Sequence, residues 1–300
     1  MATDTGVRET GGRFAWLRPP TFDDSGAMSL WDHLREIRYR LVISVIAILV
    51  LFIVAFIFYV PIVELILRPY EIAASNIRAR DPSANIQVVN SGVAAPMILA
   101  LKAAGLAAVI AACPVWLYQL WAFVVPGLLK KEKKIAGLFL LSAIPLFLTG
   151  VVVGYLILPK AFEFMLGFTV AEAGVANLQD LNDFLALEMR MLLVFGAAFL
   201  LPVVIVMLNL LGVLKSHALR KARTFAIFGC FIFGAVATPS GDPFSMLALS
   251  LPMVIMYVVS ELICSRREKR SLKLRIRSGE ISPEEAEAAY LGKTIQTDDK

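Results

Sequence analysis

The chain has 300 residues, of which 58% are hydrophobic and 18% charged, and its formal net charge is +5. The mean hydropathy of +0.74 is too high for a soluble globular domain, in which apolar residues are dispersed. Three cysteines and two histidines, none at metal-ligand spacing, argue against a metal centre, and we expect no cofactor. The cysteines fall in apolar blocks and are interpreted as small buried hydrophobes.

The apolar residues form blocks of the length that a bilayer requires, roughly 20 residues for each helix. Residues 1–27 are polar, without the apolar core of a cleavable signal peptide, and we expect them to form a cytoplasmic segment. Residues 28–265 are predicted to be an all-α polytopic membrane domain, followed by a charged tail, 266–300. The six predicted membrane spans are 38–60, 94–125, 135–158, 186–213, 222–237 and 244–264.

Lysine and arginine are concentrated in the segments on one side of these spans, which predicts that both termini are cytoplasmic. The two long outer loops contain "IVELILRPYEIAASNI" and "VANLQDLNDFLALEM", whose apolar spacing predicts small helices. Prolines inside the spans each remove a backbone donor and predict kinks, hence a concave bundle. These prolines are Pro114, Pro145, Pro202 and Pro252.

The segment "MSLWDHLREIRYRL", residues 28–41, leads into the first span. Ser29 and Asp32 have the spacing of a capping box, so a helix is expected to start here. Glu36 and Arg40 are four residues apart and lie on one helix face. Two interpretations of Glu36 are open: a surface ion pair with Arg40, or a carboxylate that binds a ligand.

A second acid, Glu132, stands among four lysines in "KKEKK", on the same predicted cytoplasmic side. A basic loop tolerates one acid, so this residue by itself is uninformative. Together, Glu36 and Glu132 are two carboxylates held among cations, which keep them ionised. Such a pair is suited to exchange its own basic partners for the forked donors of incoming arginines.

Three segments resemble the TatC family of the twin-arginine translocase: "HLREIRYRL", "YQLWAFVVPGLLKKEKK" and "TPSGDPFSMLALSLPM". They occur in this order around six predicted spans, and the resemblance covers roughly residues 28–265. It implies a non-enzymatic receptor in the cytoplasmic membrane for signal peptides that bear two consecutive arginines. It also implies assembly with small single-span TatA and TatB-type partners and export of folded proteins driven by the proton motive force.

Carried over from the family, Glu36 and Glu132 pair with the arginines of the signal peptide, and Phe123 packs against its apolar part. Pro69, in "LRPY", and Asp242 with Pro243, in "TPSGDPF", have structural roles, the last two as the start of a helix. The remaining residues that the resemblance places in the signal-peptide site are His33, Arg38, Arg40 and Pro126.

The chain departs from the family pattern in two spans. Leu200 and Met246 are apolar where many members carry a polar residue, so the family's partner contacts along the fourth to sixth spans are not carried over to this chain. Glu188 and Arg190 either pair at a loop edge or supply the missing polar contact. Glu261 is expected to meet interfacial cations such as Arg266.

The tail has a basic run, "SRREKRSLKLRIRS", followed by the acidic "SPEEAEAAYLGK". The basic run suits an anionic inner leaflet, where each cation contributes about 1 kcal/mol. Ser282 and the residues after it have the pattern of a helix start.

The main alternative is a secondary transporter or channel subunit. It requires ionisable residues facing a pathway near the middle of the membrane, and the predicted spans offer almost none. An intramembrane enzyme would need a nucleophile with its base, paired aspartates or a metal motif, and the sequence contains no such motif. Nothing in it suggests a nucleic-acid partner.

Overall fold

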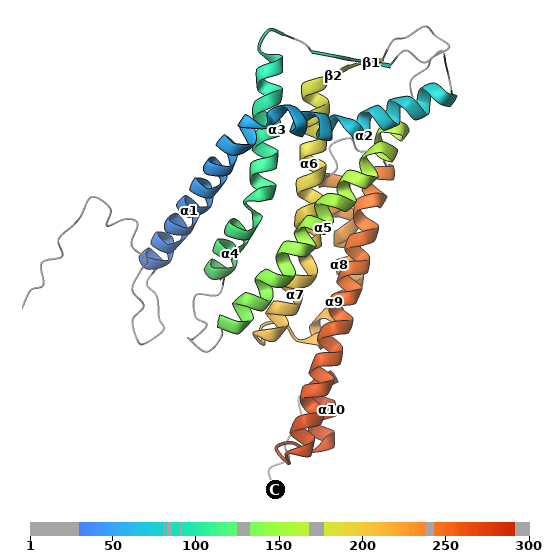
Figure 1. Cartoon of the computed structure of the whole chain (residues 1–300). Helices are drawn as coiled ribbons and strands as arrows, with labels where there is room; N and C mark the ends of the chain where they lie inside the picture. The colour runs from blue at the N-terminus through green and yellow to red at the C-terminus, as the bar shows by residue number, and fades with distance from the viewer. Residues whose placement is uncertain are drawn as a thin grey trace, which may run out of the picture.

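The computed structural model describes residues 30–80, 82, 86–90, 92–124, 133–167, 177–237 and 243–291. These residues form a helical bundle with one two-stranded sheet at its end (Figure 1). The predicted all-α membrane fold is therefore confirmed, with two short strands added. The helices are α1 Leu30–Ile57, α2 Tyr59–Arg80, α3 Ala95–Ala111, α4 Cys113–Val124, α5 Lys133–Leu166, α6 Leu181–Phe199, α7 Leu201–Leu210, α8 Ser216–Ala237, α9 Pro243–Arg277 and α10 Pro283–Leu291.

Among the described residues, four stretches are long and apolar enough to cross a membrane: Leu34–Ile57, Phe139–Leu166, Leu181–Leu210 and Pro243–Arg277. The bent pair α3 and α4 makes a fifth. Helix α8, which holds the predicted span 222–237, does not qualify, because three cations occupy its first half: Arg220, Lys221 and Arg223. The count of six spans stays a prediction.

Two of the four prolines coincide with breaks in a span. Helices α3 and α4 meet at 57°, and Pro114 is the second residue of α4. One residue, Leu200, separates α6 from α7, whose second residue is Pro202. A proline provides no N–H for the hydrogen-bond ladder, so each break falls where the ladder is already weakened. Helices α5 and α9 continue through Pro145 and Pro252.

Glycines allow α5 and α6 to pack closely. A Cβ atom at Gly150 would lie 2.5 Å from the carbonyl oxygen of Phe195, and one at Gly196 would lie 2.6 Å from the ring of Phe147. Phe195 itself is fully buried in the core between the helices. Small residues at such a crossing let two membrane helices approach each other, where van der Waals packing replaces the hydrophobic effect.

Helix α2 lies across the end of the bundle that the sequence predicts to be outside (Figure 1). The first outer-loop prediction is confirmed, because "IVELILRPYEIAASNI" lies within α2. The second is wrong in part. Asn177–Asp180 is strand β2, which pairs in parallel with β1, Ile86–Val89, and only from Leu181 does the chain become helical. The pairing partner lies about ninety residues earlier, so local apolar spacing did not reveal it.

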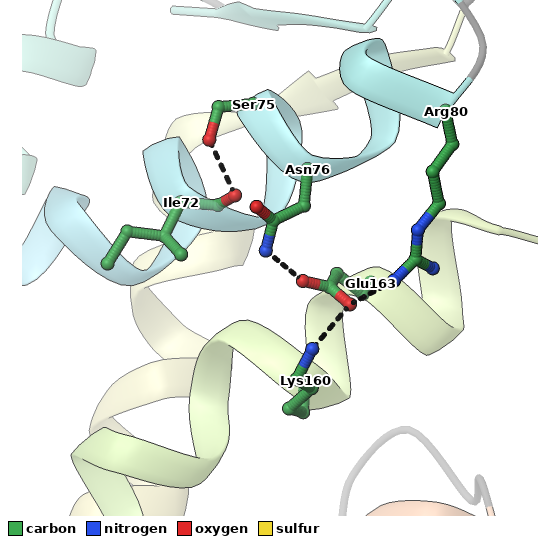
Figure 2. Close-up of polar contacts among 6 residues, drawn as sticks. All are labelled: Ile72, Ser75, Asn76, Arg80, Lys160 and Glu163. Atoms are coloured by element: carbon green, nitrogen blue, oxygen red, sulfur yellow. Dashed lines mark hydrogen bonds and ion pairs between the residues drawn. The ribbon is translucent and has the colours of Figure 1, made fainter.

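Polar contacts hold α2 onto the end of α5 (Figure 2). The buried side chain of Glu163 accepts hydrogen bonds from Asn76 and from Lys160, the latter at 3.0 Å. Arg80 lies 3.8 Å from the same carboxylate. Burial of a charge is tolerated when it is paired and hydrogen-bonded, as Glu163 is. Because its partners come from both helices, this cluster fixes α2 relative to the bundle.

Candidate functional site

Glu36 lies on the first turns of α1 and is buried, with 1% of its surface exposed. Arg40 donates to Glu36 Oε1 through Nε, at 2.9 Å, and through Nη2. The other carboxylate oxygen, Oε2, has no hydrogen-bond partner in the described part of the chain. The pairing of Glu36 with Arg40 is thus confirmed, but the carboxylate is enclosed rather than on the surface.

Arg40 also connects α1 to α4. Its Nη1 lies 3.4 Å from Oε1 of Gln119, a residue that sequence reasoning did not single out although it belongs to the quoted motif "YQLWAF". The side chain of Arg40 is 19% exposed, whereas that of Glu36 is 1% exposed, so Arg40 is the member of the pair that is nearer to the protein surface. Glu36, Arg40 and Gln119 therefore form one polar cluster between two helices that lie side by side (Figure 1).

Aromatic residues position α4 in this cluster. The indole N–H of Trp116 donates to the carbonyl of Val109 at 2.9 Å, across the break between α3 and α4. Trp121 stacks on Phe139 of α5 with ring centroids 4.3 Å apart. These contacts hold the bend and bring the end of α4 next to the start of α5, the two ends of the lysine-rich loop.

The other predicted signal-peptide residues are placed unevenly. Arg38 is exposed on α1, and Phe123 is half-buried in the last turn of α4. His33 belongs to the first turn of α1, but its side chain lies outside the described residues, as do Pro126 and Glu132 entirely. The structure therefore brings Glu36 and α4 together, while the approach of Glu132 to Glu36 stays a prediction.

The predicted structural prolines lie in helices. Pro69 is fully buried within α2, and Pro243 is the first residue of α9. Pro243 thus occupies the helix start that the sequence predicted. Asp242, its predicted cap, lies outside the described residues.

Glu188 and Arg190 do not form the loop-edge pair that was one of their two interpretations. Glu188 is fully buried in α6 and Arg190 is exposed. Neither oxygen of Glu188 has a hydrogen-bond partner within the described ranges. Glu188 is therefore a buried polar group without a partner in the described part of the chain. Leu200 and Met246, which replace the polar residues of many family members, are half-buried.

Replacing Glu188 by leucine is expected to stabilise the fold by about 1–3 kcal/mol, because a buried polar group without a partner is costly. The measurement is an unfolding titration of the purified protein in mixed micelles. Arg190→Leu, an exposed change two residues away, is the matched control and should alter stability by less than about 0.5 kcal/mol. A loss of stability in Glu188→Leu would contradict this prediction and would mean that the carboxyl group has a compensating partner.

Glu261 pairs with a different cation from the one expected. Arg223 of α8 donates to it through Nε at 2.9 Å and Nη2 at 2.6 Å, a forked geometry that Arg266 does not provide. The side chain of Glu261 is 4% exposed and that of Arg223 is 53% exposed. Sequence reasoning chose the nearer cation on the same helix, whereas packing of α8 on α9 brings Arg223 to the carboxylate.

The tail folds back on the bundle. Ser282 and Glu285 exchange hydrogen bonds at the start of α10, as a capping box does, which confirms the predicted helix start. The guanidinium carbon of Arg220 lies 4.0 Å from the ring centroid of Tyr290. The hydroxyl oxygens of Tyr290 and Ser265 are 2.8 Å apart. Burial raises the pKa of Tyr290, but hydrogen bonds from Ser265 and Lys269 and the nearby positive charges outweigh it and lower that pKa.

The long apolar helices and the enclosed polar cluster between α1 and α4 define a polytopic α-helical membrane protein. In the part of the chain that the structure describes, no group of histidine, cysteine or acidic residues is arranged to hold a metal ion. Residues 32–252 match the family model described as Sec-independent protein translocase protein (TatC). The chain therefore belongs to the TatC family, and the resemblance seen in the three motifs is confirmed.

Relatives and solved structures agree with this assignment. The Sec-independent protein translocase protein TatC of Frankia casuarinae is 38% identical over 271 residues, which cover 89% of this chain and 72% of that protein. The corresponding protein of Xylanimonas cellulosilytica is 35% identical over 230 residues, or 77% and 81% of the two chains. A crystal structure of the twin arginine translocase receptor TatC has a TM-score of 0.65 and 29% identity, and covers 77% of this chain and 99% of that one. Family membership makes Sec-independent protein translocation the class of function, in place of a small-solute transporter.

Proposed function

We propose that this protein is the receptor of a twin-arginine translocase, which binds signal peptides bearing two consecutive arginines before folded proteins are exported. The observation that carries the proposal is the environment of Glu36. This buried carboxylate already holds one guanidinium, from Arg40, and its second oxygen lacks a partner among the described residues. A carboxylate accepts forked arginine pairs better than any other side-chain ligand does.

The second arginine of the signal peptide is assigned to Glu132. Its loop joins α4 to α5, and the stacking of Trp121 on Phe139 keeps the two ends of this loop together. Helix α4 in turn is linked to Glu36 through Arg40. This continuity supports a site made by α1 and the loop, in which Phe123 contacts the apolar part of the peptide. In the same proposal Arg38, His33 and Pro126 line the site.

We place the protein in the cytoplasmic membrane with both termini in the cytoplasm. The support is the distribution of lysine and arginine, which includes the basic C-terminal part of α9. Single-span TatA and TatB-type proteins are the proposed partners, and the proton motive force is the proposed energy source. The lipid-facing side of α1 exposes Val45, Leu49 and Ile53, which suits acyl chains or a partner helix equally.

The test is direct binding of a synthetic twin-arginine signal peptide to the full-length protein in detergent micelles. We expect the peptide with two arginines to bind at least about tenfold more tightly than the same peptide with two lysines, because lysine lacks the planar fork. A peptide with the two arginines moved away from the apolar segment keeps the net charge and serves as the control. Equal affinity for all three peptides would disprove the proposed receptor role.

A further inference from the structure

The carboxylate proposed to receive the signal peptide is already occupied by a residue of this chain. Arg40 reaches Glu36 Oε1 with both Nε and Nη2, the type of contact that an incoming arginine would make. Glu36 is 1% exposed and Arg40 is 19% exposed, so the guanidinium covers the carboxylate. An arriving arginine cannot reach Oε1 while Arg40 remains in this position, and Oε2 is buried as well, so either oxygen becomes available only when Arg40 moves.

A resident cation has a physical reason in the empty receptor. A buried carboxylate without a positive partner is strongly unfavourable, and breaking a buried pair by removing one partner typically costs several kcal/mol. Arg40 therefore keeps Glu36 ionised and buried when no peptide is bound. Any peptide that takes this carboxylate must provide interactions at least as favourable as those that Arg40 gives up.

The displaced guanidinium has an alternative acceptor within reach. Oε1 of Gln119 on α4 is 3.4 Å from Nη1 of Arg40, on the side of the guanidinium that does not bond to Glu36. The guanidinium of an arginine carries five N–H donors in a fixed fork. A rotation toward α4 would therefore exchange the bonds to Glu36 for a shorter bond to Gln119, without removing Arg40 from the polar cluster.

We propose that Arg40 is a resident competitor for the Glu36 carboxylate, that Gln119 holds Arg40 when a peptide displaces it, and that this competition sets the affinity for any peptide that takes the carboxylate. The inference rests on the proposed receptor function and names the residues that tune its strength. A competitor that must leave before any peptide binds lowers the affinity for arginine and lysine peptides by the same factor. The preference for arginine over lysine comes from the fork that the peptide's own guanidinium places on Glu36, and Arg40 sets how tightly the preferred peptide is held.

The experiment compares peptides carrying two arginines or two lysines, titrated into the full-length protein in detergent. Arg40→Ala is expected to strengthen binding of both peptides by about tenfold, with the arginine preference retained, because the competitor is gone. Arg40→Lys keeps a positive charge beside Glu36 and protects folding; it should strengthen binding of both peptides by a smaller factor. Arg35→Ala, an exposed cation on the same helix, is the matched control and should leave both affinities unchanged.

Gln119→Leu tests the second half of the proposal. The displaced Arg40 would lack its acceptor, so binding of both peptides should weaken by about tenfold, the value of one hydrogen bond from a charged donor, with the arginine preference retained. Unchanged affinity in Gln119→Leu would overturn the role of Gln119. Thermal unfolding of each variant, expected within a few degrees of the wild type for Arg40→Lys and Gln119→Leu, accompanies the titrations.

Two results distinguish the proposed receptor function from the competitor role of Arg40. If the wild-type protein binds arginine and lysine peptides alike, the proposed receptor function fails. If the wild type prefers arginine and neither Arg40 variant binds the peptides more tightly, the receptor function stands and the competitor role is overturned. A parallel loss of affinity for both peptides in Arg40→Lys would also overturn it, since Arg40 would then be a direct contact of the peptide.

Discussion

Glu36→Gln is expected to lower the affinity for a twin-arginine peptide by about 10- to 100-fold. A hydrogen bond to a charged group contributes about 1.5–3 kcal/mol, and each 1.4 kcal/mol is a tenfold change in affinity. Glutamine preserves the size of the side chain and an acceptor oxygen for Arg40, so the α1–α4 cluster can persist. The loss then reports the missing negative charge rather than a collapsed site.

Peptide titration of the purified protein measures this effect, and export of a twin-arginine substrate in cells provides a second readout. Glu64→Gln is the matched control, because Glu64 is an exposed carboxylate on α2, at the other end of α1. Its affinity for the peptide should equal that of the wild type. If Glu36→Gln binds the peptide as tightly as the wild type, the carboxylate of Glu36 is a structural ion-pair partner and the peptide site lies elsewhere.

Arg223→Ala is expected to destabilise the protein, and by more than any other single change at this pair of helices. The change leaves Glu261, whose side chain is 4% exposed, without the forked donors that compensate its burial. Removing one partner of a fully buried pair costs about 3–5 kcal/mol, and the half-exposed position of Arg223 reduces that value. Unfolding titrations in mixed micelles are the measurement.

The double variant Arg223→Ala with Glu261→Leu separates the lost attraction from the stranded charge. Its stability should return to within about 1 kcal/mol of the wild type, because an apolar residue fills the site and no buried charge remains. Arg266→Ala, which removes the cation that sequence reasoning paired with Glu261, should change stability by less than about 0.5 kcal/mol. A larger effect of Arg266→Ala than of Arg223→Ala would contradict the pairing.

Much of the candidate site was predictable from local sequence. The four-residue spacing of Glu36 and Arg40 on a helix predicts their contact, and the structure confirms it. Gln119 was not predicted as part of the cluster, because its distance from Arg40 depends on how α4 packs beside α1. The same reason explains the wrong partner for Glu261: Arg266 is close in sequence, whereas Arg223 is brought close by the packing of α8 on α9.

The sequence by itself determined the class of the protein, because a bilayer requires long apolar helices whose length and composition are local properties. It also determined the family, through three motifs that a model match over residues 32–252 confirms. The tertiary structure alone decided which side chains are enclosed and with whom they pair. The link from Arg40 to Gln119, the isolation of Glu188 and the parallel pairing of β1 with β2 all depend on contacts between segments far apart in the chain. Such contacts are set by the packing of whole helices, and no local pattern encodes them.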